Sequence, residues 1–429
     1  MWRDQRIDEL ADIVSGGTPS REIAEYWGGD IAWVTPSDIT KCQGNYLSIT
    51  EEKITQLGLR NSSAKMLPKG TVLFTSRATI GESRLATKEV CTNQGFKSLI
   101  SNPGTDSRFL YYSVLLNVSK FKRYAIGSTF PEINKKDMAR VKISIPVAPE
   151  EQQKISDVIE SADKAIEKTK ALIARYENIK QGMMQDLFTR GVDENGQLRP
   201  SYEDAPHLYQ ETELGWIPKD WKFSSLDGVA PLVTSGSRDW ARFYADFGDV
   251  FVRIGNLTRE HVNFRMQNLQ HVALGDNKEG TRTKLLENDI LISITADLGI
   301  IGIVPDWNFD AYINQHIALV RADSSLVEPR YLAHYLASSL GRKQFEMLND
   351  SGAKAGLNLP TIRSLKCYLP DGDEQKSIYQ ALDSADTNVA KARNDLEKLK
   401  SIKLGLMQDL LTGKVRVAED MDERKEAVA

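Results

Sequence analysis

The sequence predicts a duplicated fold, in which two α/β (α+β) lobes are joined by a long antiparallel two-helix coiled coil with pseudo-twofold symmetry. Three observations lead to this prediction. The 429 residues are too many for one ordinary hydrophobic core. Residues 151–192 are repeated at 374–415 without a gap, and sixteen of the forty-two positions are identical. Both copies carry apolar residues at the 4-3 spacing of a coiled coil.

The order of segments along the chain is therefore lobe, helix, linker, lobe, helix. We expect a first lobe, a first helix, a linker, a second lobe, a second helix and a C-terminal tail at residues 1–147, 148–190, 191–215, 216–370, 371–415 and 416–429.

Each lobe is predicted to mix short strands with a few helices. The runs TVLFT, KSLIS, VKISIP, DILISI and IALVRA are apolar and rich in β-branched residues, and Gly, Pro or Asn bound them. RFLYYSVLLN and RYLAHYLASSL have helical spacing. The lobes also repeat each other faintly, in four pairs that keep the same order: WVTPSDI with FVRIGNL, KGTVLFTSRATIG with ENDILISITADLG, TNQGFKSLI with INQHIALVR, and VKISIP with LKCYLP.

The two repeated segments are predicted to be helices that pack against each other along one apolar seam. The seam holds the same phase for about five heptads in both copies, although Thr169 and Lys180 interrupt the first. Its residues are Ile155, Ile159, Ala162, Ile166, Ile173, Tyr176, Met183 and Leu187 in the first segment, and Ile378, Leu382, Ala385, Val389, Ala392, Leu396, Leu399, Leu406 and Leu410 in the second.

Proline and glycine mark the limits of these helices. Pro149 and Pro370 lie at the two starts, and Gly191 and Gly413 lie at the two ends. Residues 191–215 are acidic and polar, and we expect them to form a linker long enough to bring the second lobe to the opposite end. The two helices would then run antiparallel.

The charge of the chain is distributed unevenly. Residues 1–149 carry 20 Lys and Arg against 15 Asp and Glu, and residues 216–370 carry 17 of each. The remaining 18 Lys and Arg against 27 Asp and Glu give the helices and linker a net charge of −9, and the whole chain a net charge of −4. This distribution leaves the lobes free to approach phosphates. Three scattered cysteines exclude a disulfide framework or a CxxC metal site. The N-terminus lacks the apolar stretch of a secretory signal and no apolar run is long enough for a membrane span, so we expect a cytoplasmic protein.

Several segments resemble the DNA specificity subunits of type I restriction-modification systems. They are RIDELADIVSGGTPSR at 6–21, the EEQ and SAD of the first helix, LGWIPKDW at 214–221 and QDLLTGKVRV at 408–417. The resemblance covers essentially the whole chain. It implies that each lobe is a target-recognition domain that reads one half of a split site in double-stranded DNA. It also implies that the helices space the lobes and dock two modification (methyltransferase) subunits, and that restriction (motor-nuclease) subunits join the complex.

Motifs of catalysis are missing from the sequence. It contains no G-x-x-x-x-G-K-[ST] P-loop, and neither an N/D-P-P-Y/F tetrapeptide nor an F-x-G-x-G loop for methyl transfer. We therefore expect a non-catalytic chain, with S-adenosylmethionine, ATP and Mg²⁺ bound by partner subunits. Pro370, Asp371, Glu374 and Lys376 imitate a nuclease motif, but acidic residues in a first helical turn are ordinary capping chemistry. The five histidines show no metal-ligand spacing.

Candidate DNA-binding residues lie in the repeated polar segments. Arg77 follows a predicted strand and can reach guanine or a phosphate, while its counterpart region offers the acceptors Thr295 and Asp297. The amides of Asn93-Gln94 and Asn314-Gln315 either satisfy a turn or read an adenine edge. The candidates are Thr35, Ser37, Ser76, Arg77, Thr79, Gln94, Lys97, Ser128, Thr129, Arg238, Arg253, Asn256, Thr295, Asp297, Gln315, His316 and Lys354.

The repeated Met-Gln-Asp-Leu near the end of each helix is predicted to dock the methyltransferase with outward-facing residues, which are Met184, Gln185, Asp186, Met407, Gln408 and Asp409. Two other functions stay open from sequence alone. One is a specificity half detached from a single-chain restriction-methylation enzyme, against which the missing motifs count. The other is a coiled-coil adaptor whose two lobes bind proteins and not DNA.

Overall fold

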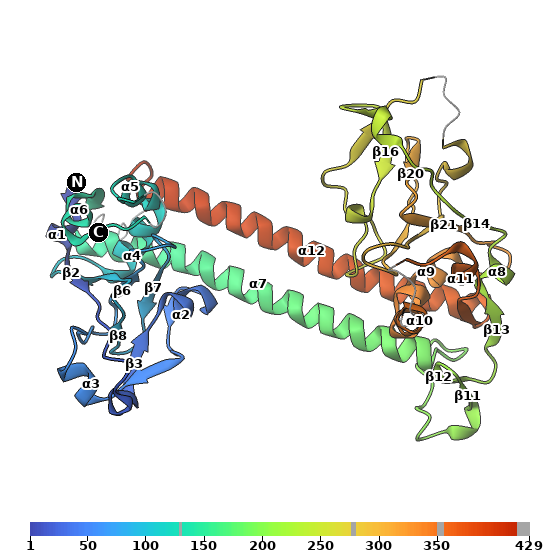
Figure 1. The fold of residues 1–429 in the computed structure, drawn as a ribbon, viewed down its shortest axis with the longest axis horizontal. Helices are drawn as coiled ribbons and strands as arrows, with labels where there is room; N and C mark the ends of the chain where they lie inside the picture. The colour runs from blue at the N-terminus through green and yellow to red at the C-terminus, as the bar shows by residue number, and fades with distance from the viewer. Residues whose placement is uncertain (128–130, 276–279, 350–355, 418–429) are drawn as a thin grey trace, which may run out of the picture. The chain divides into compact units, whose positions relative to one another are not determined.

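The computed structural model describes residues 1–127, 131–275, 280–349 and 356–417. Contacts divide the chain into two compact units, residues 1–171 with 393–429 and residues 172–392. Each unit holds one lobe and one end of each of two long helices, α7 (Pro149–Thr189) and α12 (Gly372–Leu410), which Figure 1 draws in green and red.

The first lobe contains a five-stranded sheet of order β2-β9-β6-β7-β4, a three-stranded sheet of order β5-β3-β8 and an antiparallel pair β1-β10. Its elements are β1 (Trp2–Arg6), α1 (Ile7–Leu10), β2 (Ala11–Ser15), η1 (Ala24–Tyr26), β3 (Trp27–Val34), α2 (Pro36–Lys41), β4 (Tyr46–Leu47), β5 (Glu52–Ile54), α3 (Gln56–Arg60), β6 (Val72–Phe74), β7 (Ser83–Ala86), β8 (Cys91–Thr92), β9 (Lys97–Ser101), α4 (Ser107–Leu116), α5 (Val118–Arg123), α6 (Lys135–Arg140) and β10 (Lys142–Pro146).

The second lobe contains a four-stranded sheet of order β14-β21-β18-β19, a second of order β15-β17-β16-β20 and the pair β13-β22. Its elements are β13 (Lys222–Ser225), α8 (Leu226–Val229), β14 (Leu232–Ser235), η3 (Trp240–Phe243), β15 (Tyr244–Ala245), β16 (Asp249–Val252), η4 (Ile254–Asn256), β17 (Gln270–Val272), η5 (Thr281–Thr283), β18 (Ile290–Ser293), β19 (Ile301–Ile303), β20 (Ala311–Ile313), β21 (Ile317–Arg321), α9 (Pro329–Ala337), α10 (Ser339–Asn349), α11 (Leu359–Arg363) and β22 (Lys366–Leu369).

The two lobes have the same plan, which confirms the faint sequence repeat. Each begins with a strand that pairs with its last strand, and each has a mainly antiparallel sheet beside a second sheet. One parallel pair recurs in this second sheet of each lobe, as β3-β8 and as β16-β20. Because most of the pairing is antiparallel, α+β describes the lobes better than α/β.

The lobe cores extend onto the long helices. In the first unit, Ile155 and Ile159 of α7 and Met407 of α12 belong to the buried cluster of the first lobe. In the second unit, Leu187 and Phe188 of α7 belong to the cluster of the second lobe, together with the first turns of α12. Each helix is therefore packed on the first lobe at one end and on the second lobe at the other.

The predicted apolar seam is confirmed, since none of its residues is exposed. Two ion pairs fix the direction of the helices. Asp163 of α7 pairs with Lys403 of α12 in the first unit, and Lys180 of α7 pairs with Asp386 of α12 in the second. Moving forward along α7 therefore corresponds to moving backward along α12, so the helices are antiparallel as predicted. Lys403 and Asp386 are also the repeat counterparts of Lys180 and Asp163, so the two pairs are related by the internal symmetry.

The start of each long helix is held on its lobe by the same glutamine. Gln152 donates to the carbonyl of Pro146 over 3.0 Å and accepts from the Asp106 amide over 2.8 Å. Its counterpart Gln375 makes the equivalent bonds, each of 2.8 Å, to Pro370 and Glu328. Both glutamines are buried, so these bonds also satisfy polar groups that could not reach water.

The segment that we expected to be a polar linker has structure of its own. After a short helix η2 (Pro206–Leu208), strands β11 (Tyr209–Thr212) and β12 (Gly215–Pro218) form a hairpin. Arg199 ties the segment to the second unit through bonds of 2.9 Å to Asp220 and to the buried Glu374 of α12. Polar composition predicted a linker without elements of its own, but an arginine with two carboxylate partners orders this backbone.

Candidate nucleic-acid interface

Loops that follow four strands of the first lobe meet at one place. The amide of Gly17, after β2, donates to Thr92 of β8 over 2.9 Å. The amide of Asn93, after β8, donates to Val34 of β3 over 3.0 Å. The amide of Ser76, after β6, donates to Gly95 over 2.7 Å. The predicted segments around Thr35, Arg77 and Gln94 are therefore neighbours, and we call the loops at 16–18, 35–37, 76–79 and 93–95 the first loop cluster.

The second lobe builds the same arrangement from different residues. The amide of Gln315 donates to Ser237 over 3.1 Å, and the amide of Ile294 donates to His316 over 3.0 Å. The loops at 236–238, 253–256, 294–297 and 314–316 form the second loop cluster. Ile294 corresponds to Ser76 in the sequence repeat, so the backbone frame is shared while the side chains differ.

Both clusters contain the same backbone irregularity. Ala78 has a φ of 56° and its repeat counterpart Ala296 has a φ of 58°. The left-handed region is costly for a residue with a Cβ atom, and such residues gather at functional sites. The turn beside Arg77 and Thr295 is thus held in one unusual shape in both lobes.

Glu132 pairs with the two predicted cations of the first cluster. Arg77, about half exposed, donates from Nε to Glu132 over 2.8 Å, which uses one of the five donors of its guanidinium group. Lys97 lies 3.6 Å from the same carboxylate but is buried, and its burial lowers the pKa of the ammonium group. Arg77 is accessible from solvent at this position, whereas Lys97 is enclosed.

Three predicted residues are placed inside the lobes, which corrects the expectation that they contact DNA directly. Lys97 is one of them. Ser76 is completely buried and donates to the carbonyl of Gly95 over 3.0 Å. Asn256 is 3% exposed, accepts from the amide of Arg253 over 3.0 Å and donates to the carbonyl of Arg265 over 3.2 Å. Buried polar groups must find such partners, so these side chains support the loops.

The other predicted residues of the first cluster lie nearer the surface. Thr35 is half-buried and caps α2 through its contacts with Asp38, while Ser37 is exposed in the first turn of that helix. Thr79 is exposed beside Arg77. Gln94 is also exposed, and its carbonyl accepts from the hydroxyl of Thr18. The hydroxyl and amide groups of these side chains offer both hydrogen-bond donors and hydrogen-bond acceptors to a ligand.

In the second cluster the predicted residues surround His316. Its Nδ1 lies 2.8 Å from Thr295 Oγ1, and its Nε2 lies 2.8 Å from the amide nitrogen of Gln315. His316 and Arg253 also line an open hollow of about 500 Å³ with Asn268 and Asn314.

Exposed charges border this second cluster. Arg238 is exposed in the turn after β14. Asp297 is exposed and accepts from Arg259 over 2.5 Å. The three remaining candidates, Ser128, Thr129 and Lys354, lie outside the described residues.

The structure distinguishes the asparagine from the glutamine in each Asn-Gln pair. Asn93 accepts from the amide of Gly95 over 2.9 Å, and Asn314 accepts from the amide of His316 over 3.1 Å. The asparagines therefore satisfy a turn. The glutamines that follow them are left as the candidates for reading a base.

Of the predicted docking residues, two are corrected by their burial. Met184 is 6% exposed and Met407 is 7% exposed, and each lies in the core of a lobe. They cannot be outward-facing contacts, because the helix ends are themselves packed on the lobes. Gln185 and Gln408 are exposed, and Asp186 and Asp409 are half-buried, so docking through these four stays a prediction.

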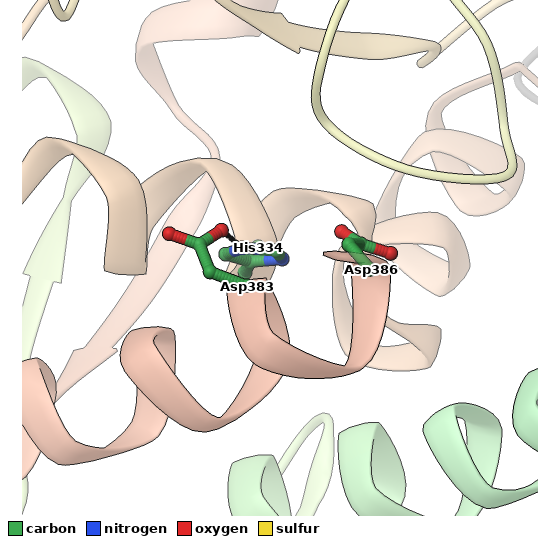
Figure 2. A group of neighbouring side chains, drawn as sticks. All are labelled: His334, Asp383 and Asp386. Carbon is green, nitrogen blue, oxygen red and sulfur yellow. Dashed lines mark hydrogen bonds and ion pairs between the residues drawn. The ribbon is translucent and has the colours of Figure 1, made fainter. Parts of the chain in front are cut away.

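A polar cluster in the second unit was not predicted. Figure 2 shows His334 of α9 beside Asp383 and Asp386 of α12, with ligand-type atoms all within 4.8 Å of one another. Arg330 grips Asp383 with bonds of 2.6 and 3.0 Å, and Lys180 pairs with Asp386. Since two cations already neutralise the carboxylates, a divalent metal ion would meet repulsion there. The cluster instead joins the lobe to both helices.

This cluster also lowers the pKa of the Asp383 carboxyl group. Burial acts to raise the pKa of Asp383, but hydrogen bonds from His334 and Arg330 outweigh it and lower the pKa to about 2. The first lobe has a related set, in which Arg108 bonds Asp157 and Glu160 over 2.7 and 2.8 Å. The signal in the sequence was the identical SAD and IK segments of the repeat, which hold Asp386 and Lys180.

The nuclease-like motif is explained by helix capping. Asp371 is exposed and accepts from the amide of Glu374 over 2.9 Å. Glu374 is buried and bonded to Arg199 and Trp221. The carboxylates are therefore occupied at a helix start and do not converge on a metal site. Among the described residues, no helix is long and apolar enough to cross a bilayer.

Comparison with known proteins gives a consistent family. The family described as "Type I restriction modification DNA specificity domain" matches residues 1–177 and 218–401. The type I restriction enzyme MjaIX specificity subunit of Methanocaldococcus jannaschii is 27% identical over 427 residues, which cover 97% of this chain and 94% of that protein. The EcoR124I/EcoR124II specificity subunit of Escherichia coli is 26% identical over 164 residues, 37% of this chain and 40% of that protein.

A solved structure shares the fold. The type I restriction-modification S subunit from M. genitalium superposes with a TM-score of 0.58 at 16% identity, over 96% of each chain. A chain from a structure on complex assembly and conformational transition of the type I R-M system superposes with a TM-score of 0.57 at 16% identity, over 96% of this chain and 98% of that one.

Proposed function

The chain belongs to the type I restriction modification DNA specificity family, and on that premise we propose that each lobe reads one half of a split DNA site. The observation that carries the proposal is the pair of loop clusters. Both are built on one backbone frame, yet Arg77 and Gly95 of the first are replaced by Thr295 and His316 in the second. Two readers of different sequences need this combination of a shared frame and different side chains.

We further propose that the chemistry resides in partner subunits. The chain lacks the P-loop and methyltransferase motifs, so S-adenosylmethionine, ATP and Mg²⁺ would be bound by two modification subunits and by restriction subunits, in the cytoplasm. The neighbouring structure that concerns assembly of a type I R-M system supports a role in such a complex. Gln185 and Gln408, exposed near the two helix ends, are candidates for docking.

An exchange of one lobe tests the two-reader function. Replacing residues 1–145 with the equivalent lobe of a relative should change one half of the recognised site and leave the other half as it was. Methylation mapping on single DNA molecules, with the modification partner present, measures the result. A simultaneous change in both halves would contradict the proposal, and so would a failure of the unaltered chain with its partner to retain DNA.

The absence of intrinsic chemistry has its own test. The pure chain is incubated with DNA, Mg²⁺, ATP and labelled S-adenosylmethionine. We expect no methyl transfer and no cleavage until partner subunits are added. Transfer that rises in proportion to the amount of this chain alone would place catalysis here instead.

A further inference from the structure

The side chains of Thr295, His316 and Gln315 form a chain of hydrogen bonds in the second loop cluster. His316 is contacted at both ring nitrogens, by Thr295 Oγ1 and by Gln315 Nε2, each over 2.8 Å. The backbone of His316 is held as well, because its amide donates to Asn314 and its carbonyl accepts from Ile294. The imidazole is therefore held in place, and the Gln315 amide is hydrogen-bonded to it.

The donors and acceptors of this chain allow one arrangement of protons. The amide nitrogen of a glutamine only donates, so the Nε2 atom of His316 that faces it must accept. The ring proton is then on Nδ1, where it donates to the hydroxyl of Thr295. As a consequence, the Gln315 amide is held with its nitrogen towards His316. One N–H and the carbonyl oxygen Oε1 are left over for a ligand.

This leftover pair matches one base edge. An amide N–H beside an amide oxygen pairs with N7 and the N6 amino group of adenine in the major groove. Guanine offers two acceptors at the same places, O6 and N7, and O6 would face Oε1. Gln315 and His316 are half-buried at the surface of the cluster, and His316 lines the open hollow with Arg253.

We propose that Gln315 reads an adenine in the half-site bound by the second lobe, and that His316 is the positioning residue that fixes the direction of its amide. This inference rests on the proposed function. The first lobe provides the contrast, because its equivalent Gln94 is followed by Gly95 and is held through its carbonyl by Thr18. That contact leaves the amino group of Gln94 for a ligand, so the two equivalent glutamines present different groups.

The test uses the full chain with its modification subunits and a DNA library randomised in both half-sites. The wild type should enrich adenine at one position of the second lobe's half-site, over guanine by roughly 5- to 150-fold. Gln315→Glu should lose that preference and favour cytosine, since a carboxylate accepts from the N4 amino group. His316→Phe keeps an aromatic ring but should lower the preference for adenine over guanine about 2- to 10-fold at the same position.

Gln94→Glu is the matched control and should change only the other half-site. An unchanged first half-site in Gln315→Glu and His316→Phe shows that each variant is folded and binds DNA. If Gln315→Glu selects the same bases as the wild type, the reading role is refuted. If His316→Phe keeps the wild-type ratio of adenine to guanine, the positioning role is refuted. A wild type that enriches no sequence in either half would refute the proposed function itself.

Discussion

Lys180 and Asp386 form an ion pair that is almost fully removed from water, with side chains 6% and 4% exposed. The ammonium group also donates to the carbonyl of Glu260 over 2.6 Å. Desolvation makes such a pair a modest contributor to stability as a whole, but removing one partner leaves a buried charge without compensation. The repeat counterpart, Lys403 with Asp163, is 19% and 15% exposed, so water reaches it more easily.

Replacing Lys180 by methionine should therefore destabilise the protein by about 3–5 kcal/mol. Lys403→Met, the matched variant in the other unit, should cost less, about 1–2 kcal/mol, because its site is more hydrated. Urea unfolding of both variants measures the difference. The double variant Lys180→Met with Asp386→Leu should recover most of the loss. Equal costs for the two single variants would contradict the explanation from burial.

Asp383 makes stability depend on acid. Its pKa in the folded state is about 2, against an ordinary value of 3.8, so the folded state binds this proton less readily than the unfolded state does. The stabilisation is complete above about pH 4 and is lost as the pH falls towards 2. Asp383→Asn should lower the melting temperature at pH 7 by a few degrees, and this difference should shrink between pH 4 and 2.

The control for this acid effect is Asp227→Asn in the same lobe. Asp227 also has an arginine partner, Arg363 at 2.6 Å, but its side chain is 59% exposed. Exposed ion pairs contribute little to stability, so the melting temperature of this variant should be close to that of the wild type at pH 7 and at pH 2. A pH-independent difference for Asp383→Asn would show that the residue matters for packing and not for its charge.

At the level of helices, strands and loops, the features with a strong period could be predicted from the sequence. The seam, the two helix starts and the four repeated strand segments were all found, because a period of 3.5 or a run of β-branched residues is a local property. Lys180 was recorded as an interruption of the seam. Its partner Asp386 could not be deduced, since that requires knowing which turns of two distant helices meet.

The site was harder to predict for the same reason. Ser76, Lys97 and Asn256 are polar and stand beside true surface residues, so the sequence gives no sign that they are enclosed. Segment 191–215 looked like a linker because composition does not reveal that Arg199 meets Glu374. Polar groups with distant partners are thus the common cause of the differences.

A close approach of loops depends on one glycine in each lobe. A Cβ atom on Gly16 would lie 1.9 Å from the carbonyl of Asn93, and one on Gly236 would lie 2.1 Å from the carbonyl of Ile313. The obstacle is backbone in both cases, so the loop that follows β2 or β14 would have to move. Gly16→Ala should weaken recognition of the first lobe's half-site, and Gly236→Ala that of the second.

Selection from a library randomised in both half-sites measures these effects. Gly372→Ala is the control, because nothing lies within 4 Å of a Cβ atom placed there. Loss of both half-sites in Gly16→Ala would indicate general unfolding and not a local shift of one loop.

At the scale of the whole molecule, we expect the length of α7 and α12 to set the gap between the two half-sites. Both helices continue between the two ion pairs, from Asp163 to Lys180 in α7 and from Asp386 to Lys403 in α12. Inserting seven residues after Glu167 and after Ala390 adds one heptad to each and keeps the phase of the seam. The added length is about 10 Å, or roughly three base pairs. The lengthened chain should select the same half-sites with a longer gap between them.

The control insertion of seven residues follows Glu203, which is exposed and lies outside both helices. It should leave the gap as it was. Activity that is retained with an unchanged gap in the lengthened chain would mean that the helices do not set the spacing.

The two symmetry-related ion pairs also suggest how a protein with two different recognition lobes could arise. Asp163 and Lys180 lie on one helix, and Lys403 and Asp386 repeat them. A chain with one half alone would carry both the acid and the base of the contact, so two copies could satisfy each other around a true twofold axis. Such a homodimer has identical lobes and is restricted to palindromes. Fusion of the two halves into one gene removes that restriction, since each lobe can then mutate without changing its twin.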